Sequence, residues 1–447
     1  MDRCFHHSGG DDDVVSEIKT SKGGEEGMKR LMTFALVVTL IYTAALAHPL
    51  KEYLENHKGE VLWNFEKVQT MDDGTQIHYL HVRSQVWKGI EWNNNVALIY
   101  PPEMRHEELA VLLIAKGFSR DVEENLWIAK AFGVPFCVVG NVPNQPLFGG
   151  YREDDLIAYT FVKFMETKEA DWPLLFPMVQ SVVAAMDAIE EYTTSIGRKI
   201  EGFVVTGASK RGWTTWLTAA VDKRVKAIIP IVYDNLNLPE QMPHQLEMWG
   251  AYSEKISPYT KRGLPDLLSS SQGIELVKMV DPFFLRDALG IPKFIVIATN
   301  DRYWPIDAVN LYVNEIPGEN YILYIPNDRH DISNIAYLVL NAGSFTTALL
   351  EGKLPELNWE FQVEKDSIVV SWEINSLVEE INFWSARSVN TDFRNSIWIK
   401  KRLDVRDSVK VLADEKYNLA FFVELVLQID GRKLHLCSPA RVLLSRK

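Results

Sequence analysis

Apolar runs and amphipathic stretches alternate through residues 75–350. Continuous apolar runs such as AVLLIAKGF are typical of parallel strands that are covered on both faces of a sheet. Strands are expected at 75–82, 96–100, 110–118, 134–140, 202–206, 225–233, 293–299 and 321–325. Helices are expected at 122–132, 176–192, 210–220, 306–315 and 332–350. Strands that alternate with helices imply β-α-β units and an α/β fold with one doubly wound, mostly parallel sheet.

Two further regions have a different pattern. Segment 234–290 is too long for a simple crossover between strands and is rich in Trp, Tyr and Pro. It is expected to form a helical cap over the active edge of the sheet, within an α/β domain spanning 48–350. Short β-type runs at close spacing follow, which predicts a C-terminal all-β sandwich domain at 355–447.

The N-terminal region has the layout of a secretory signal. Residues 28–47 combine two basic residues, an apolar run and a small-x-small ending at Ala47, which predicts cleavage after Ala47 and a secreted protein. A membrane anchor is the alternative, but the run is short and closes on small residues, so no stable membrane span is expected after cleavage. Residues 1–27 are either a disordered extension or lie before the true start at Met28.

Composition excludes some classes of function. The formal net charge of −13 argues against nucleic acid as a partner, because phosphate binding requires a basic surface. The three cysteines show neither metal-ligand spacing nor a disulfide framework. His244 and Glu247 stand at i, i+3, but no third zinc ligand accompanies them. We therefore predict no metal and no cofactor.

Ser209 lies in the stretch VVTGASKRGWTTW, which reads as a strand, a tight turn and a helix. A serine nucleophile of the G-x-S-x-G type occupies such a turn. Gly207 supplies the small residue before the serine, but Arg211 stands where the second glycine is usual. The alternative is that Ser209 is only a helix N-cap.

Two later residues favour a nucleophile. Asp301 follows the strand at 293–299, and His330 follows the strand at 321–325. Serine, acid and histidine in this order, each at a strand end, match the arrangement of a catalytic triad on a doubly wound sheet. Asp307 and Asp234 are reserves for the acid.

Further residues are candidates for binding. The backbone N–H groups of Lys210 and of Gly117, in the turn after the strand at 110–118, are expected to form the oxyanion hole. Polar residues in the loop near 142–160 and in the cap are candidates for substrate binding, or else they are loop residues and helix caps. These are Asn144, Gln145, Arg152, Glu153, Arg211, His244 and Glu247.

Several long blocks of this chain resemble one family. They are VPNQPL, REDDLIAYT, DWPLLFPMVQSVVAAMDAI, VTGASKRGWTTWLTAAVDKRVKAIIPIVYDNLN, ATNDRYWPIDA and IPNDRHDI. Over residues 50–445 the chain is similar to the PhoPQ-activated pathogenicity-related proteins. That resemblance implies an exported α/β-hydrolase-fold protein with a C-terminal β domain.

The resemblance also places the site. The family's nucleophile falls on Ser209, and its acid and histidine fall on Asp301 and His330. Arg211 is part of the family pattern. The chain departs from that pattern at LLIAKGFSR, where Lys116 replaces a small residue.

Two functions follow as hypotheses. The first is a secreted serine hydrolase that cleaves a small-molecule ester or a peptide through an acyl-enzyme. The second is a secreted signalling or binding protein of the growth-repressor or virulence-associated type, with a cell-surface receptor as partner and no need for catalysis. In that case segments 234–260 or 355–445 are expected to present the receptor surface.

Overall fold

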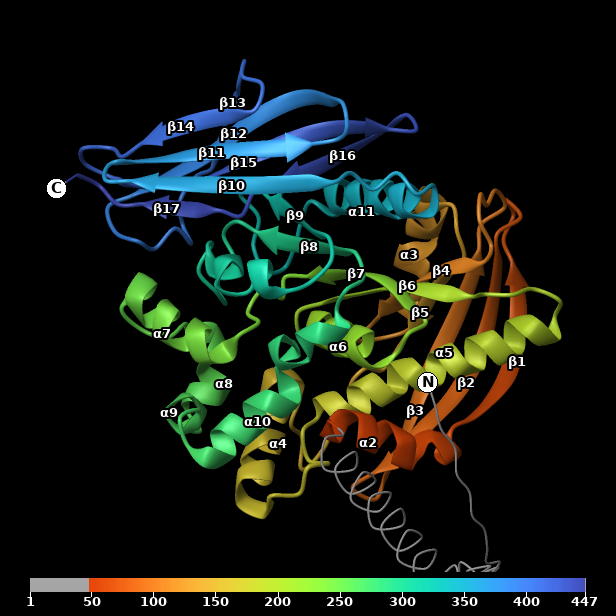
Figure 1. The fold of residues 1–447 in the computed structure, drawn as a ribbon. Coiled ribbons are helices and arrows are strands. Elements are labelled where there is room, and N and C mark those ends of the chain that lie inside the picture. Colours follow the sequence, from red (N-terminus) through yellow and green to blue (C-terminus); the bar gives the residue numbers. More distant parts are fainter. Residues whose placement is uncertain (1–47, 447) are drawn as a thin grey trace, which may run out of the picture. The chain divides into compact units, whose positions relative to one another are not determined.

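The computed structural model describes residues 48–446 of the chain (Figure 1). The expected signal peptide at 28–47 and the segment 1–27 lie outside the described residues. The central sheet runs in the order β1-β2-β3-β5-β4-β6-β7-β8-β9 before it continues into later strands. Its strands are β1 (Leu62–Thr70), β2 (Gln76–Trp87), β3 (Ile90–Tyr100), β4 (Leu109–Ile114), β5 (Phe136–Val139), β6 (Gly202–Ala208), β7 (Val225–Ile231), β8 (Lys293–Ala298) and β9 (Asn320–Ile325).

The strands from β5 to β9 are parallel to one another, whereas β1, β2 and β3 pair antiparallel. The parallel strands are buried almost throughout, as their continuous apolar sequences predict. Strand β1 is an exposed edge strand, and the sequence interpretation missed it because its few apolar residues form neither a continuous run nor a regular alternation.

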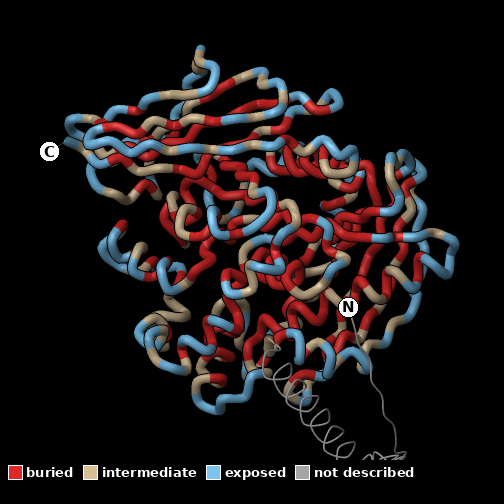
Figure 2. The backbone as a smooth tube through the Cα atoms, viewed as in Figure 1, coloured by how far each residue is buried: buried red, intermediate tan, exposed pale blue. Residues whose placement is uncertain are grey.

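Helices cover both faces of the sheet (Figures 1 and 2). On one face α2 (Pro49–His57), α5 (Leu175–Ser195) and α6 (Lys210–Val221) pack in one apolar cluster. On the other face α3 (Ser119–Phe132) and α11 (Ile335–Leu350) pack in a second cluster. No helix within residues 48–446 is both long and apolar enough to cross a membrane. The predicted doubly wound, mostly parallel α/β fold is confirmed.

One predicted helix is wrong. Residues 306–315 form two short 3₁₀ turns, η4 (Ala308–Leu311) and η5 (Val313–Glu315), instead of an α-helix. The side-chain amide of Asn310 donates to the backbone carbonyls of Asp307 and Ala440, both at 2.8 Å. Side-chain bonds of this kind compete with helical hydrogen bonds, and Tyr312 leaves the helical region with a φ of −147°.

Segment 234–290 contains short helices. They are α7 (Leu238–Trp249), α8 (Ser257–Thr260), α9 (Leu264–Leu267) and α10 (Ser271–Val280), with the 3₁₀ turns η2 (Glu254–Ile256) and η3 (Pro282–Ala288). Together with α4 (Glu153–Thr167) they lie beside the ends of the parallel strands (Figure 1). This is the position of the cap that the sequence predicts.

The C-terminal region is antiparallel β structure in two sheets. A three-stranded sheet contains β10 (Leu357–Glu364), β11 (Ser367–Ile374) and β14 (Ser408–Leu412). The other strands are β12 (Val378–Ser388), β13 (Ile399–Arg402), β15 (Asn418–Ile429), β16 (Arg432–Cys437) and β17 (Arg441–Leu443). These strands extend the central sheet, because β16 pairs with β9 at Cys437 and Ile322. The sequence did not predict this continuity.

Candidate active site

Ser209 occupies the turn between β6 and α6 in a strained conformation. Its φ of 58° and ψ of −126° lie in a region that non-glycine residues rarely adopt. The turn is held by hydrogen bonds from the Ser209 N–H to the Ile231 carbonyl (2.8 Å) and from the Trp213 N–H to the Ser209 carbonyl (3.0 Å). The Ser209 hydroxyl makes no capping hydrogen bond to the helix. The geometry therefore favours a half-buried serine at a sharp elbow over a helix N-cap.

Two glycines allow strand β6 and helix α6 to pack closely at this elbow. A Cβ at Gly207 would lie 2.8 Å from the backbone oxygen of Arg211, and one at Gly212 would lie 2.8 Å from the Cβ of Tyr233. Gly212 thus faces the end of the neighbouring strand β7. Arg211, which directly precedes Gly212, does not disturb the packing of Gly212 against Tyr233. Its side chain points instead toward Glu153 and the carbonyl of Val142.

His330 and Asp301 form a close pair. The Nδ1 atom of His330 lies 2.7 Å from Oδ2 of Asp301, and Oδ1 of Asp301 accepts the N–H of Tyr303 at 2.8 Å. The Tyr303 ring packs on the imidazole with a centroid distance of 4.1 Å. Within the described part of the chain, Nε2 of His330 is buried and has no hydrogen-bond partner. His330 and Ser209 line the same cavity.

The two reserve acids lie elsewhere. Oδ1 of Asp307 lies 2.9 Å from Nε2 of His244, in a separate pair. Burial alone would lower the pKa of His244, but its hydrogen bond to Asp307 and the charge there raise it above its ordinary value. Asp234 is buried after β7, and burial, reinforced by the charge of Asp301, raises its pKa to about 8. Of the three acids, Asp301 is the one in contact with His330.

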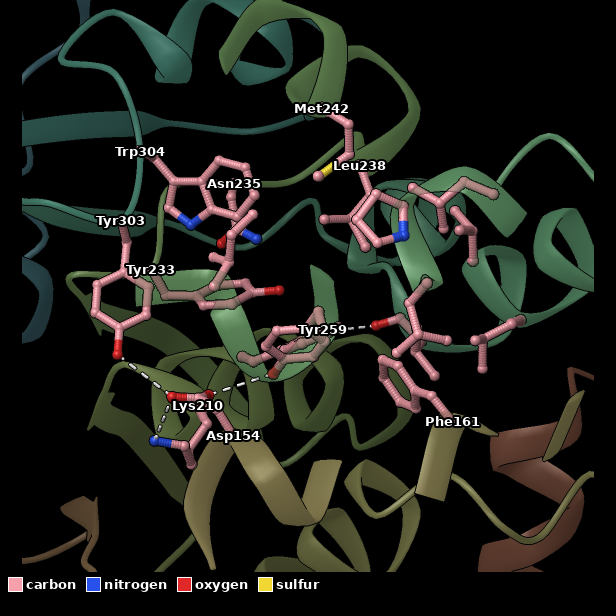
Figure 3. Close-up of a pocket in the computed structure, with 18 of the residues that line it drawn as sticks. Asp154, Phe161, Lys210, Tyr233, Asn235, Leu238, Met242, Tyr259, Tyr303 and Trp304 are labelled. Carbon is pink, nitrogen blue, oxygen red and sulfur yellow. Dashed lines mark hydrogen bonds and ion pairs between the residues drawn. The ribbon is translucent and has the colours of Figure 1, made fainter. Parts of the chain in front are cut away.

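The cavity beside Ser209 has a volume of about 100 Å³ and lies under the cap helices. Figure 3 shows Lys210, Tyr259 and Tyr303 around Asp154 at one side, whereas Asn235 lies beside Trp304. The Asp154 carboxylate accepts hydrogen bonds from the hydroxyls of Tyr259 and Tyr303, both at 3.3 Å, and lies 3.6 Å from Nζ of Lys210. The sequence interpretation missed Tyr259 and Tyr303. The stretch DRYWP, which begins at the acid itself, was a signal for Tyr303.

A cluster of charged side chains holds the two residues that follow Ser209 at the start of α6. Oε2 of Glu153 lies 2.7 Å from Nζ of Lys210, and Oε1 lies 3.1 Å from the Arg211 guanidinium and 3.4 Å from Nζ of Lys116. Burial alone would raise the pKa of Glu153, but the charges of Arg211 and Lys210 hold it well below its ordinary value. Neither Glu153 nor Arg211 is among the residues that line the cavity of Ser209.

Replacing Glu153 by Gln is expected to lower the free energy of unfolding by about 2 kcal/mol. Removing one partner of a buried ion pair leaves uncompensated charge, here on Lys210 and Arg211, and the partly exposed carboxylate softens the full effect. Urea unfolding measures the change. The control is Glu166→Gln, which breaks an exposed pair with Lys163 and should leave the unfolding curve unchanged. Equal curves for both variants would contradict a supporting role for Glu153.

The other candidates for binding are spread over two places. Asn144, Gln145 and Arg152 line a separate pocket together with Gly117 and Lys116. His244 and Glu247 lie on α7 and are not among the residues that line the cavity of Ser209. The structure thus brings together Ser209, Lys210, His330 and Asp301, and leaves these five candidates and Gly117 outside that cavity.

The loop 391–398 of the C-terminal region contacts the turns that carry the acid and the histidine. The Asn300 side-chain amide donates to the carbonyls of Ser396 (2.7 Å) and Arg394 (3.3 Å). The Asn327 side chain makes two hydrogen bonds with the backbone of Trp398, at 2.7 and 2.9 Å. Because Asn300 precedes Asp301 and Asn327 precedes His330 by three positions, this loop helps to fix both turns.

The same loop also reaches the cap. The Arg394 guanidinium lies 4.0 Å from the centre of the Trp249 ring at the end of α7. The Thr391 hydroxyl donates to the backbone carbonyl of Met248 at 2.5 Å. Loop 391–398 therefore joins the cap to the strand ends that carry Asp301 and His330.

A doubly wound sheet in this strand order, with a serine elbow after β6 and later turns at the same edge, defines the α/β-hydrolase fold. The chain belongs to the family of PhoPQ-activated pathogenicity-related proteins, whose family model matches residues 50–394. The family and the fold class predicted from the sequence are both confirmed.

The chain is similar to several named proteins. Autocrine proliferation repressor protein A from Dictyostelium discoideum is 34% identical over 395 residues, which cover 81% of this chain and 78% of that protein. Among solved structures, the chain is similar to acetyl xylan esterase 1 from Thermoanaerobacterium sp. JW/SL YS485, with 14% identity and a TM-score of 0.48 over 67% of this chain and 92% of that one. An acetyl xylan esterase from Paenibacillus sp. R4 has 12% identity and a TM-score of 0.45, over 68% and 95% of the two chains.

Proposed function

We propose that the protein is a serine hydrolase that cleaves an ester through Ser209, His330 and Asp301. The observation that supports this most directly is the orientation of His330. One ring nitrogen contacts Asp301 at 2.7 Å, and the other is buried without a partner in a residue that shares a cavity with Ser209. This is the arrangement that a general base requires, because one nitrogen is held and the other is available.

The proposed reaction has two halves. In the first, Oγ of Ser209 attacks the ester carbonyl while its proton passes to Nε2 of His330, and the C–O bond to the alcohol then breaks as His330 returns the proton to the leaving oxygen. In the second, water attacks the acyl-enzyme, His330 takes its proton, and Ser209 recovers that proton as the acid leaves. Asp301 holds the imidazole through Nδ1 and stabilises the imidazolium.

The oxyanion of each tetrahedral intermediate needs hydrogen-bond donors. Lys210 is the first residue of α6, and the first amides of a helix have no acceptor within the helix. Its backbone N–H is therefore a suitable donor beside Ser209. The sequence offered Gly117, in the turn after β4, for the second donor, but Gly117 does not line the cavity of Ser209.

Labelling with a fluorophosphonate probe tests the proposal. The wild-type protein is expected to be labelled, because an activated serine attacks phosphorus as it attacks an ester carbonyl. Ser209→Ala should lose the label, and Ser195→Ala, at the exposed end of α5, should keep it. A folded wild-type protein that is not labelled, or a labelled Ser209→Ala variant, would refute this function.

A second candidate function is extracellular signalling through a cell-surface receptor. The name of the Dictyostelium relative, a proliferation repressor, favours it. The signal-like residues 28–47 support export with cleavage after Ala47, and mass spectrometry of protein from the culture medium would show whether the chain begins at His48. If signalling does not need catalysis, growth repression by the Ser209→Ala protein should equal that of the wild type.

A further inference from the structure

We propose that the cavity beside Ser209 is a chamber for an unbranched apolar chain of the ester, a substrate class that rests on the proposed function. Most of its wall is apolar and comes from α4, α6, the cap, the end of β7 and Trp304 in the turn after β8, while Tyr233 and Asn235 add buried polar atoms to it. The apolar residues that line it are Phe161, Met165, Trp213, Val232, Leu238, Met242, Ile256, Leu264, Pro265, Leu267, Leu268, Leu276, Val277, Val280 and Trp304.

The polar side of the chamber offers little to a charged substrate, because its charges are already matched. Nζ of Lys210 is paired with Glu153 at 2.7 Å and approaches Asp154 at 3.6 Å. Asp154 also accepts the hydroxyls of Tyr259 and Tyr303. Burial and the nearby Asp154 raise the pKa of Tyr259 well above its ordinary value, so that its hydroxyl remains a neutral donor. A substrate ammonium or carboxylate would have to displace these contacts.

The direction of the chamber places the chain relative to the reacting atoms. Lys210 and Tyr303 both approach Asp154 at the polar side, Ser209 directly precedes Lys210, and His330 packs on Tyr303. The cap contributes wall residues from α7, α9 and α10. In Figure 3 Asp154, Lys210 and Tyr303 lie together, while Leu238, Met242 and Phe161 lie on the other side. An ester carbonyl beside Ser209 would therefore extend an apolar chain toward the cap helices.

The small volume favours a narrow chain over a branched or aromatic group. A cavity of about 100 Å³ is smaller than the engineered apolar cavity of about 150 Å³ that holds benzene. Each methylene that enters an apolar site is removed from water. Because this burial stabilises the bound transition state, we expect kcat/KM to rise roughly fourfold for each added methylene until the chamber is filled.

Two series of esters test the proposal and show which part of the ester enters the chamber. In the first, p-nitrophenyl esters vary the acyl chain from acetate to decanoate. In the second, acetate esters vary the alcohol from methyl to decyl. We expect kcat/KM to rise roughly fourfold per methylene in one series and then to fall beyond the chain that fills the space. Flat profiles in both series would overturn the proposal, while labelling of Ser209 would still support the proposed function.

Val277→Phe places a larger side chain in the wall that α10 contributes. It is expected to lower the ratio of kcat/KM for the chain length that the wild type prefers, in whichever series responds, to that for the shortest ester at least tenfold. Ile274→Phe, on the exposed face of the same helix, is the matched control and should leave that ratio unchanged. If Val277→Phe fails to fold, Met165→Phe narrows the chamber from α4. An unchanged ratio in a folded variant would overturn the proposal.

A separate measurement covers the case in which no ester is cleaved and Ser209 is not labelled. That result would refute the proposed function, so the chamber would then be tested by calorimetric titration of the wild type with octanamide. Octanamide binding that Val277→Phe weakens at least tenfold and Ile274→Phe leaves unchanged would support an apolar chamber without catalysis. Absence of octanamide binding would overturn the chamber as well.

Discussion

The Asp301→Asn variant is expected to lose about 10⁴-fold in kcat for ester hydrolysis while it keeps its fold. Oδ2 of Asp301 lies 2.7 Å from Nδ1 of His330, and Oδ1 accepts the N–H of Tyr303. An asparagine in this place keeps the Tyr303 contact through its carbonyl oxygen and turns its amide toward Nδ1. The amide donates, so Nδ1 must accept, and the proton is then held at Nε2, where a general base must be free.

Steady-state kinetics with the best p-nitrophenyl ester from the chain-length series measures this loss, and circular dichroism checks the fold. The matched control is Asp307→Asn, since Asp307 forms the other acid–histidine pair, with His244 at 2.9 Å. The kcat of the Asp307→Asn control should stay within about threefold of the wild-type value. A larger loss in Asp307→Asn than in Asp301→Asn would show that the acid has been assigned wrongly.

The second large effect concerns stability. Asp234→Asn is expected to stabilise the protein relative to wild type as the pH rises from about 4 to about 8. The pKa of Asp234 is raised from 3.8 to about 8, first by burial and then by the charge of Asp301. Between these values the unfolded chain releases the proton and the folded chain keeps it. The folded wild type therefore loses stability with rising pH, by up to about 1.4 kcal/mol per pH unit, and the neutral asparagine does not.

Urea unfolding at pH 5, 7 and 9 measures the difference between wild type and variant. Asp281→Asn is the contrasting control. Burial raises the pKa of Asp281 to about 6, but its carboxylate also accepts the backbone N–H groups of Asn237, Leu238 and Phe283. Asparagine cannot accept all three, so this variant should be destabilised at every pH. A constant difference between wild type and Asp234→Asn across the three pH values would contradict a proton held by Asp234.

The central elements were predictable because their determinants are local. Long apolar runs specify buried strands at any position in the chain, and the parallel arrangement brings the ends of all such strands to one edge. Once Ser209, Asp301 and His330 were assigned to strand ends, their proximity was expected from topology. In the structure His330 contacts Asp301 and lines the cavity of Ser209, and the catalytic roles of the three residues stay a prediction.

Other features depend on contacts between distant parts of the chain, and the sequence did not reveal them. The pairing of β16 with β9 joins residues more than a hundred positions apart at Cys437 and Ile322. The role of Arg211 depends on where Glu153 lies in space, because the same arginine could have faced the substrate. The wall of the cavity is equally hidden, since apolar residues such as Val277 have the same appearance in a core and in a binding site.

Loop 391–398 links local unfolding of the C-terminal region to the order of the candidate active site. Asn300 and Asn327 find backbone partners at Ser396 and Trp398, so a local opening of the C-terminal strands leaves both amides without those partners and loosens the turns of Asp301 and His330. A partly open molecule that keeps its central sheet would still be folded by most spectroscopic measures, but it would hold no ordered acid and base. The proposed catalytic unit therefore includes loop 391–398 of the C-terminal region.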